Sequence, residues 1–172
     1  DDISLRAIDV IKSADFIYTE DTRSFKKILD SIECKKKCKS FHEHNEDIIC
    51  KEIIKHLKNK KHVVLTCEAG TPAISDPGYK LIRECLNLNL KYTLIPGPSS
   101  LINAVVLSGL PTDKFSFYGF IPKKNTAQKK LFQKVSNDEK TAIVFESVKR
   151  LRKTIISISK HLDNNRHIAV CR

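Results

Sequence analysis

Apolar positions along the chain follow two spacings that alternate from one end to the other. In one kind of segment apolar residues repeat every three or four positions, which is typical of an amphipathic helix. In the other kind, β-branched and aromatic residues form short runs, which are typical of strands. The pattern predicts helices at 3–14, 49–57, 79–88, 98–108 and 148–162, and a basic helix between 120 and 141. It predicts strands at 16–19, 40–44, 62–66, 91–95, 115–120, 141–145 and 167–171.

This alternation also predicts the fold class. Strands that alternate with helices form mostly parallel sheets, and their loops gather at the carboxyl ends of the strands. After the turn-rich stretch 109–114 the strand and helix pattern starts again. We therefore expect an α/β protein with an N-terminal domain at 1–110 and a C-terminal domain at 111–172.

The composition is that of a folded protein with an excess of positive charge. The 172 residues are 41% hydrophobic, and 31 basic against 20 acidic residues give a net charge of +11. Such a charge attracts polyanions, with nucleic acid as the first candidate. An AT-rich genome, which enriches lysine, isoleucine and asparagine, explains the same excess without a partner. The longest apolar runs are far shorter than the roughly 18 residues of a membrane span, so no membrane helix is expected.

The chain contains no methionine, and residue 1 is therefore expected not to be the natural start. Six cysteines lack the spacing of a disulfide framework and no signal peptide precedes them, which predicts reduced thiols and a cytoplasmic protein. Cys34, Cys38, His42 and His44 are conceivable zinc ligands, but only the first two have a suitable spacing, so no metal site is expected.

Glycine and proline are confined to the middle of the chain, between residues 70 and 122. No two glycines are closer than eight residues, which excludes the dinucleotide fingerprint and the P-loop. The G-x-S-x-G elbow and the H-E-x-x-H zinc motif are also absent. Nucleotide hydrolysis and the common hydrolase chemistries therefore have no support in the sequence.

The turn-rich loop 68–78 carries two carboxylates, two hydroxyls and backbone amides, and it has no lysine. A loop of this kind suits a ligand with ribose hydroxyls, an amino group and a flat base but no phosphate, and S-adenosylmethionine has these features. A second loop, with Ser99 and Ser100 at the start of a helix, offers backbone amides to a carboxylate or a base edge. Together these loops predict a nucleoside-binding site.

Six ordered motifs then carry a resemblance that runs over essentially the whole chain. They are EDTR at 20–23, HEHN at 42–45, AGTPAISDPG at 69–78, PGPSS at 96–100, GLPTD at 109–113 and FES at 145–147. In this order they resemble the ribosomal RNA small subunit methyltransferase I family of the tetrapyrrole methylase superfamily. One departure is Glu68, where the family usually has the shorter aspartate.

The resemblance implies a class III methyltransferase of two α/β domains, homodimeric, with S-adenosylmethionine in the cleft between them. The implied reaction is 2′-O-methylation of a cytidine in the decoding region of 16S rRNA. The family's first strand and glycine loop are expected before residue 1, and further elements after residue 172. The implied cofactor contacts are Glu68, Gly70, Thr71, Ile74, Ser100, Leu101, Phe145 and Glu146. The implied substrate contacts are Glu20, Arg23, Glu43, His44 and Asn45.

A ribose hydroxyl becomes a good nucleophile when a base removes or shares its proton. The candidate bases are Glu20, Asp21, His42 and His44, of which we favour His42 or Asp21. An imidazole is suited to this task at neutral pH. An equally good interpretation is that these residues orient loops or contact phosphate, and Arg23 could pair with a carboxylate or hold an RNA phosphate.

Basic residues cluster at 35–37, 58–61, 123–130 and 149–153, and the default interpretation of each cluster is a solvated helix face. The lysines at 123–130 are the best placed to hold phosphates, which predicts salt-dependent binding. Few aromatic residues interleave them, so no base-stacking platform is expected. Two alternatives stay open: a corrinoid or tetrapyrrole precursor methyltransferase, and a non-catalytic RNA-binding remnant of the same fold.

Overall fold

The computed structural model describes residues 2–68, 70–163 and 165–172. The chain divides into two compact units, Asp1–Ser99 and Ser100–Arg172, each with a sheet of its own. The division falls between Ser99 and Ser100, before the expected boundary at 110. The domain boundary at 110 stays a prediction.

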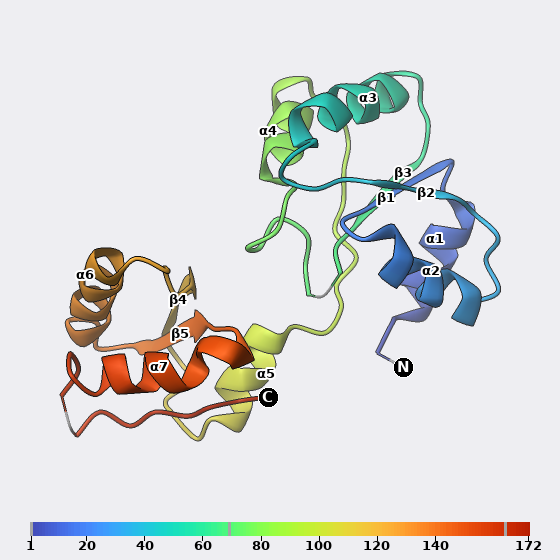
Figure 1. Cartoon of the computed structure of the whole chain (residues 1–172). Coiled ribbons are helices and arrows are strands. Elements are labelled where there is room, and N and C mark those ends of the chain that lie inside the picture. The colour runs from blue at the N-terminus through green and yellow to red at the C-terminus, as the bar shows by residue number, and fades with distance from the viewer. Residues whose placement is uncertain (1, 69, 164) are drawn as a thin grey trace. The chain divides into compact units, whose positions relative to one another are not determined.

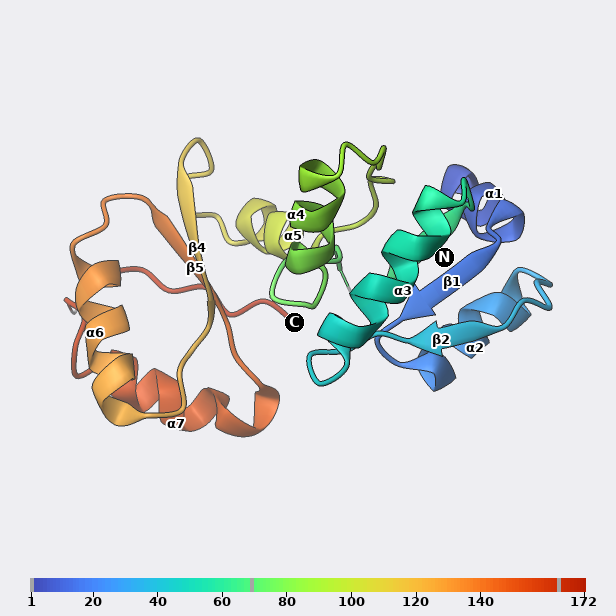
Figure 2. The same cartoon turned by 90° about the horizontal axis from the view of Figure 1, so that it is seen from above.

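The first unit is a three-stranded parallel sheet with helices on both faces (Figures 1 and 2). Its strands are β1 (Phe16–Thr19), β2 (Cys38–Ser40) and β3 (Val63–Thr66), in the spatial order β2-β1-β3. Its helices are α1 (Leu5–Ser13), α2 (Thr22–Ser31), α3 (Glu46–Lys58) and α4 (Tyr79–Asn87). Both pairings to β1 are parallel, as the alternation of strands and helices predicts.

The central strand β1 divides the core of this unit into two clusters. Successive side chains of a strand point to opposite faces, so Ile17 and Tyr18 belong to different clusters. Ile17 packs with residues of α1 and α2, including Phe25 and Leu29. Tyr18 packs with residues of α3 and α4, including Ile53. This two-sided burial explains why β1 is mostly apolar.

The second unit contains two parallel strands, β4 (Phe115–Phe120) and β5 (Thr141–Phe145). The helices α5 (Ser100–Leu107), α6 (Asn125–Ser136) and α7 (Val148–Ile158) complete it. The β4–β5 register shifts between Phe117 and Phe120, where Gly119 has a φ of 70°. Glycine adopts this conformation without the steric cost that other residues have, which allows the irregularity at the end of β4.

Most of the elements predicted from the sequence are present, and the exceptions have physical reasons. The strands expected at 91–95 and 167–171 are not formed, and neither segment pairs with a neighbouring strand among the residues described. Apolar side chains in both, such as Leu94 and Val170, remain more than half exposed. The strand expected at 40–44 ends at Ser40, and helix α2 was not predicted.

Within the described ranges, no helix is long and apolar enough to cross a membrane. The same residues contain no group of three or more His, Cys, Asp or Glu side chains that could hold a metal ion.

Candidate active site

The carboxyl ends of β1, β2 and β3 bring three of the sequence motifs to one edge of the first unit. The strands are parallel and in register, so the segments that follow them start side by side. The backbone N–H of Phe41, after β2, donates to the Thr19 carbonyl at 2.8 Å. The Ser24 hydroxyl, on α2, donates to Oε1 of Glu68 at 3.2 Å. The loops after β1 and β3 are therefore in direct contact, as expected for a parallel sheet.

The loop after β3 has an unusual backbone, with positive φ at Gly70, Ala73, Ser75 and Gly78. L-residues rarely adopt such angles, and their occurrence here marks a tightly turned segment. The turn is closed by the N–H of Ala73, which donates to the Pro77 carbonyl at 3.3 Å. At Gly78, where φ is 133°, a Cβ atom would lie 3.3 Å from the Leu65 side chain, a tight contact that adds to the backbone preference for glycine. The loop is held close against β3.

Glu46, the first residue of α3, anchors the end of this loop. Its Oε1 accepts the backbone N–H of Gly78 at 3.0 Å, and Oε2 lies 3.7 Å from Nζ of Lys80. The residue is only 9% exposed. Sequence reasoning missed Glu46, because an acidic residue at a helix start is ordinarily explained by the helix dipole, and its partner is 32 residues away.

Replacing Glu46 by alanine should destabilise the loop, because the buried N–H of Gly78 would lose its acceptor. The expected cost is about 1–3 kcal/mol of unfolding free energy. Glu46→Gln, which keeps an acceptor oxygen, should cost less. Urea unfolding together with hydrogen exchange over residues 70–80 measures both. Equal stability of the wild type and Glu46→Ala would show that the bond does not hold the loop.

Four carboxylates of the motifs interact at this edge of the sheet. Burial, Asp76, Glu68 and Glu43 together raise the pKa of Glu20 above its usual value. Burial and the charge of Glu68 also raise the pKa of Asp76. None of the four forms an ion pair with a basic side chain within the described parts of the chain. The edge therefore has an uncompensated negative charge, although the protein as a whole is positive.

Cys67 lies among these carboxylates. Its Sγ donates to the Gly70 carbonyl at 3.3 Å. Burial, together with the charge of Asp76, raises the pKa of the thiol to about 12. A thiol with such a pKa is not a nucleophile at neutral pH. Cys67 therefore helps to hold the loop and carries no chemistry of its own.

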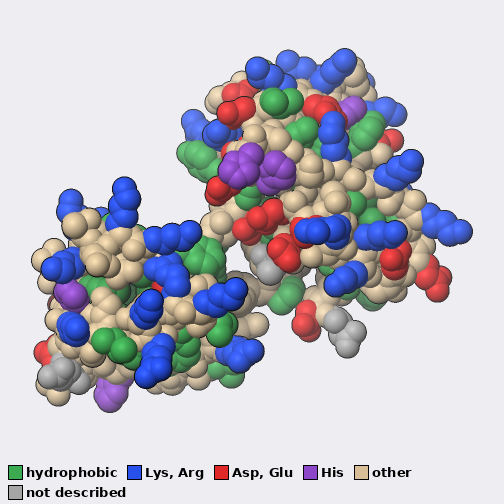
Figure 3. Space-filling view, in the orientation of Figure 1, with side chains coloured by type: hydrophobic (Ala, Val, Ile, Leu, Met, Phe, Trp, Pro, Cys, Tyr) green, Lys and Arg blue, Asp and Glu red, His purple; other side chains and the backbone are tan. Residues whose placement is uncertain are grey.

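His42 has a buried ring nitrogen without a partner. Its Nδ1 forms no hydrogen bond with any described residue. The loop around it is ordered by Asn45, whose Oδ1 accepts the His42 backbone N–H at 2.8 Å and whose Nδ2 donates to the Ser40 carbonyl at 3.1 Å. The ring of His44 lies edge-on at 5.9 Å. Histidine and acidic side chains lie close together on the surface of this unit (Figure 3).

The other residues of the EDTR motif have structural partners. Asp21 caps helix α2, accepting the N–H groups of Arg23 at 2.8 Å and Ser24 at 3.5 Å. These bonds lower the pKa of Asp21. A carboxylate that is stabilised in this way is a weaker base, so the geometry favours His42 over Asp21. Arg23 pairs with Asp21 at 3.4 Å while its side chain is 91% exposed, which leaves it accessible to a phosphate.

The remaining predicted site residues lie in the second unit. Ser100 and Leu101 begin α5, Phe145 ends β5, and Glu146 directly follows it. The structure describes the two units separately, so the prediction that these residues complete one cavity with Thr71 stays a prediction. Within the second unit, Phe145 packs edge-on against Phe117 at 4.9 Å.

Glu146 is the centre of a hydrogen-bond network. Its Oε2 accepts the Thr154 hydroxyl at 2.6 Å and lies 3.3 Å from the Arg150 guanidinium, while Oε1 accepts the Ser147 N–H at 2.7 Å. The side chain is 6% exposed. The position predicted as a cofactor contact thus joins the end of β5 to α7, and its carboxylate is already occupied.

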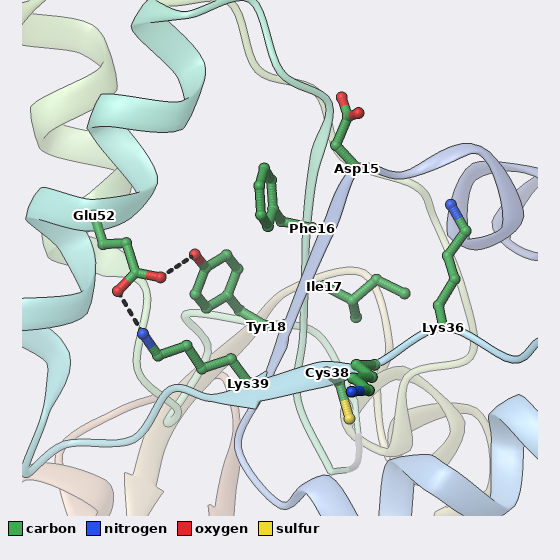
Figure 4. Close-up of a pocket in the computed structure, with 9 residues that line it drawn as sticks. Asp15, Phe16, Ile17, Tyr18, Lys36, Cys38, Lys39 and Glu52 are labelled. Carbon is green, nitrogen blue, oxygen red and sulfur yellow. Dashed lines mark hydrogen bonds and ion pairs between the residues drawn. The ribbon is translucent and has the colours of Figure 1, made fainter.

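A cavity of about 420 Å³ elsewhere in the first unit involves none of the predicted site residues (Figure 4). At one side of it Glu52 accepts the Tyr18 hydroxyl at 2.8 Å and pairs with Lys39. These three polar groups therefore form hydrogen bonds with one another. The lining residues of the cavity are Asp15, Phe16, Ile17, Tyr18, Lys36, Lys37, Cys38, Lys39 and Glu52.

Comparison with known proteins agrees with the motif analysis. The sequence profile of the tetrapyrrole (corrin/porphyrin) methylases matches residues 1–172. The chain is 42% identical over 172 residues to ribosomal RNA small subunit methyltransferase I of Rickettsia prowazekii, and covers 61% of that protein. It is 39% identical to the protein of the same name from Hydrogenobaculum, of which it covers 74%.

Solved structures share the fold at low sequence identity. A diphthine synthase superposes with a TM-score of 0.68 at 16% identity, over 92% of this chain and 67% of that one. Uroporphyrin-III C-methyltransferase from Thermus thermophilus, solved with S-adenosylhomocysteine, superposes with a TM-score of 0.57 at 15% identity, over 96% and 71%. These similarities confirm the predicted class III methyltransferase fold.

The chain spans about three fifths of the length of several relatives that it matches throughout. The motifs, the profile match and the relatives agree on one assignment. The chain belongs to the tetrapyrrole (corrin/porphyrin) methylase family, in its ribosomal RNA small subunit methyltransferase I group.

Proposed function

We propose that this protein transfers a methyl group from S-adenosylmethionine to RNA of the small ribosomal subunit, at the 2′-oxygen of a cytidine in the decoding region. The main support is the convergence of the EDTR, HEHN and AGTPAISDPG motifs at the carboxyl edge of one parallel sheet. Relatives that are 33–42% identical over the chain bear the name ribosomal RNA small subunit methyltransferase I.

The residues of the first unit fit a cationic nucleoside. Glu68 and Asp76 lie without basic partners beside the loop, which suits a ligand that carries a sulfonium and an ammonium group. At Gly70 a Cβ atom would meet nothing within 4 Å, so the backbone there is open to an approaching group. Gly70, Thr71 and Ile74 would hold the nucleoside. Ser100, Leu101, Phe145 and Glu146 are proposed to contribute from the second unit.

S-adenosylmethionine, when bound, supplies a methyl group with a good leaving group. The task of this chain's own residues is to position the ribose and to take its proton. His42 Nδ1 is buried without a partner, so a substrate hydroxyl would supply the missing hydrogen bond and transfer its proton there. Asn45 fixes the backbone of His42. The ring of His44 lies beside that of His42. Glu20, Glu43 and His44 would contact the substrate, and the exposed Arg23 would hold a phosphate.

Replacing Asp76 by asparagine should stabilise the protein and weaken cofactor binding. The pKa of Asp76 is raised in the folded state, so its contribution to stability is present below the unfolded pKa and is lost as pH rises through the folded one. The variant should match the wild type near pH 3 and exceed it at pH 7, by at most about 1 kcal/mol. Calorimetry should show weaker S-adenosylmethionine binding. A less stable variant at pH 7 would contradict the electrostatic explanation.

The two alternatives make different predictions in one experiment. The protein and methyl-labelled S-adenosylmethionine are incubated in two separate reactions. One reaction contains unmodified small ribosomal subunits, and the other contains a uroporphyrinogen. Label in the ribosomal RNA supports the proposal. Label in the macrocycle alone would assign a tetrapyrrole methyltransferase, and no transfer to either acceptor, with RNA still bound, would assign a non-catalytic remnant.

The oligomeric state and the cellular location of this protein are also proposals, and the dimer rests on the resemblance to the ribosomal RNA small subunit methyltransferase I family. We propose a homodimer in the cytoplasm, and light scattering of the purified protein tests the dimer directly. A mass equal to one chain at micromolar concentration would contradict it.

A further inference from the structure

The positive charge of the protein is concentrated in one of its two units. Residues 1–99 contain 17 basic and 15 acidic residues, a net charge of +2, whereas residues 100–172 contain 14 and 5, a net charge of +9. On the visible face of the second unit, Lys and Arg side chains are accordingly far more prominent than acidic ones (Figure 3). Basic residues are about equally frequent in the two units, so the difference comes from the small number of acidic residues in the second unit, which a genome-wide lysine bias does not explain.

The basic side chains of the second unit also lack acidic partners. Among the described residues, the first unit contains ion pairs of Arg23, Lys39, Lys61 and Lys80 with carboxylates. In the described part of the second unit the one such pair is Arg150 with Glu146. The lysines there are therefore available to external anions.

Arg150 brings two basic segments together that are far apart in the sequence. Its Nη1 donates to the Ile121 carbonyl at 3.1 Å and its Nη2 to the Pro122 carbonyl at 3.0 Å. These bonds tie the start of α7 to the connection that follows β4. Lys123 and Lys124 come directly after this connection, and Lys149 comes directly before Arg150. We define the basic surface as the exposed residues Lys123, Lys124, Lys149, Arg152 and Lys153.

An aromatic ring lies next to this basic surface. Phe120 ends β4, three residues before Lys123, and is 59% exposed. Its ring is held edge-on against Phe145, with the centroids 5.4 Å apart. The register shift before Phe120 re-aims the end of the strand, as such irregularities do next to functional sites. The basic surface and the ring thus occupy the carboxyl ends of β4 and β5, where parallel α/β folds bind their ligands.

We infer that this part of the second unit binds single-stranded RNA, with the basic surface holding phosphates and Phe120 stacking on a base. Lysine and arginine side chains without acidic partners favour a polyphosphate backbone, and an exposed ring offers a face to any base. From the sequence no base-stacking platform was expected, because few aromatic residues interleave the lysines; the structure adds that the ring of Phe120 is exposed. This inference names the RNA-holding surface for the function proposed above, and rests on that proposal for the identity of the RNA.

The test measures binding of a fluorescent single-stranded RNA with the sequence of the decoding region, without cofactor, over a series of salt concentrations. The test variant is Lys123→Gln, Lys124→Gln, Lys149→Gln and Lys153→Gln combined. The matched control replaces four exposed lysines of the first unit by glutamine: Lys12, Lys51, Lys55 and Lys58.

The slope of log affinity against log salt should fall by about 0.7 for each RNA phosphate that the variant no longer neutralises, and so by roughly three in the test variant. The control should change it by less than about one. Phe120→Ala should weaken binding by about tenfold, and Phe120→Tyr, which keeps the ring, should not. Equal slopes for the test variant and the control would overturn the inference.

Two further outcomes separate this inference from its neighbours. If the test variant lost binding to phosphatidylserine vesicles and kept its affinity for RNA, the surface would be a membrane contact and the inference would be wrong. The binding assay needs no methyl transfer. Loss of RNA binding in the test variant therefore supports the inference that this surface binds RNA, even if the wild type methylates nothing. If the wild type methylated the RNA fully and the test variant bound RNA normally, the proposed function would stand. The inference that this surface binds RNA would then be wrong.

Discussion

Replacing His42 by alanine is expected to reduce methyl transfer to small-subunit RNA by about 10²–10⁴-fold, the usual contribution of a general base. The reason is that His42 has a buried ring nitrogen without a partner, in a loop whose backbone is fixed by Asn45. The loss should be in the rate constant rather than in RNA affinity. Single-turnover kinetics with labelled cofactor measures it.

His44→Ala and Asp21→Asn are the informative controls. His44 is an exposed neighbour of His42, and Asp21 caps a helix with a lowered pKa, so neither should approach the effect of His42→Ala. Asp21→Asn keeps a capping residue and should leave stability almost unchanged. Full activity of His42→Ala, or a larger loss in Asp21→Asn, would move the base away from His42.

Glu146→Ala should destabilise the second unit by about 1–3 kcal/mol, because it removes a buried carboxylate that accepts hydrogen bonds and pairs with the half-buried Arg150 guanidinium. The change also removes the acceptor of the Thr154 hydroxyl. Thr154 is only 4% exposed. Hydrogen exchange should therefore accelerate over β5 and α7 and not over β1. Urea unfolding measures the free energy.

The control for Glu146 is Glu139→Ala, an exposed acidic residue of the same unit that forms no ion pair with any described residue. This change should be within about 0.5 kcal/mol of the wild type. If both variants were equally stable, the network at the end of β5 would contribute nothing.

The local features of the fold were predictable because their signals are local. The strand at 16–19 was predicted with its observed bounds, since a short run of aromatic and β-branched residues between helical patterns has few other interpretations. Helix α2 was missed although Phe25, Ile28 and Leu29 have helical spacing, because the polar EDTR motif that runs into its first turn resembles a loop. The segment 91–95 has a strand-like sequence, but a strand also needs a neighbour to pair with.

The site was only partly predictable, for a different reason. The alternation of strands and helices correctly indicated that loops gather at the carboxyl ends of parallel strands. That the loops around Thr71 and Ser100 share one cavity stays a prediction. The contributions of Glu46, Arg150 and Phe120 depend on contacts between residues that are distant in the sequence. No spacing rule brings such pairs together, so a single sequence could not reveal them.

The proposed reaction is tested most directly by the chemical identity of the product nucleoside. Unmodified small subunits are treated with the protein and deuterated-methyl S-adenosylmethionine, and the RNA is digested and analysed by mass spectrometry. We predict one deuterated methyl group on the ribose of a cytidine in the decoding region, and none with His42→Ala. A deuterated methyl group on a base, or RNA without any label under conditions in which the protein binds both partners, would contradict the proposal.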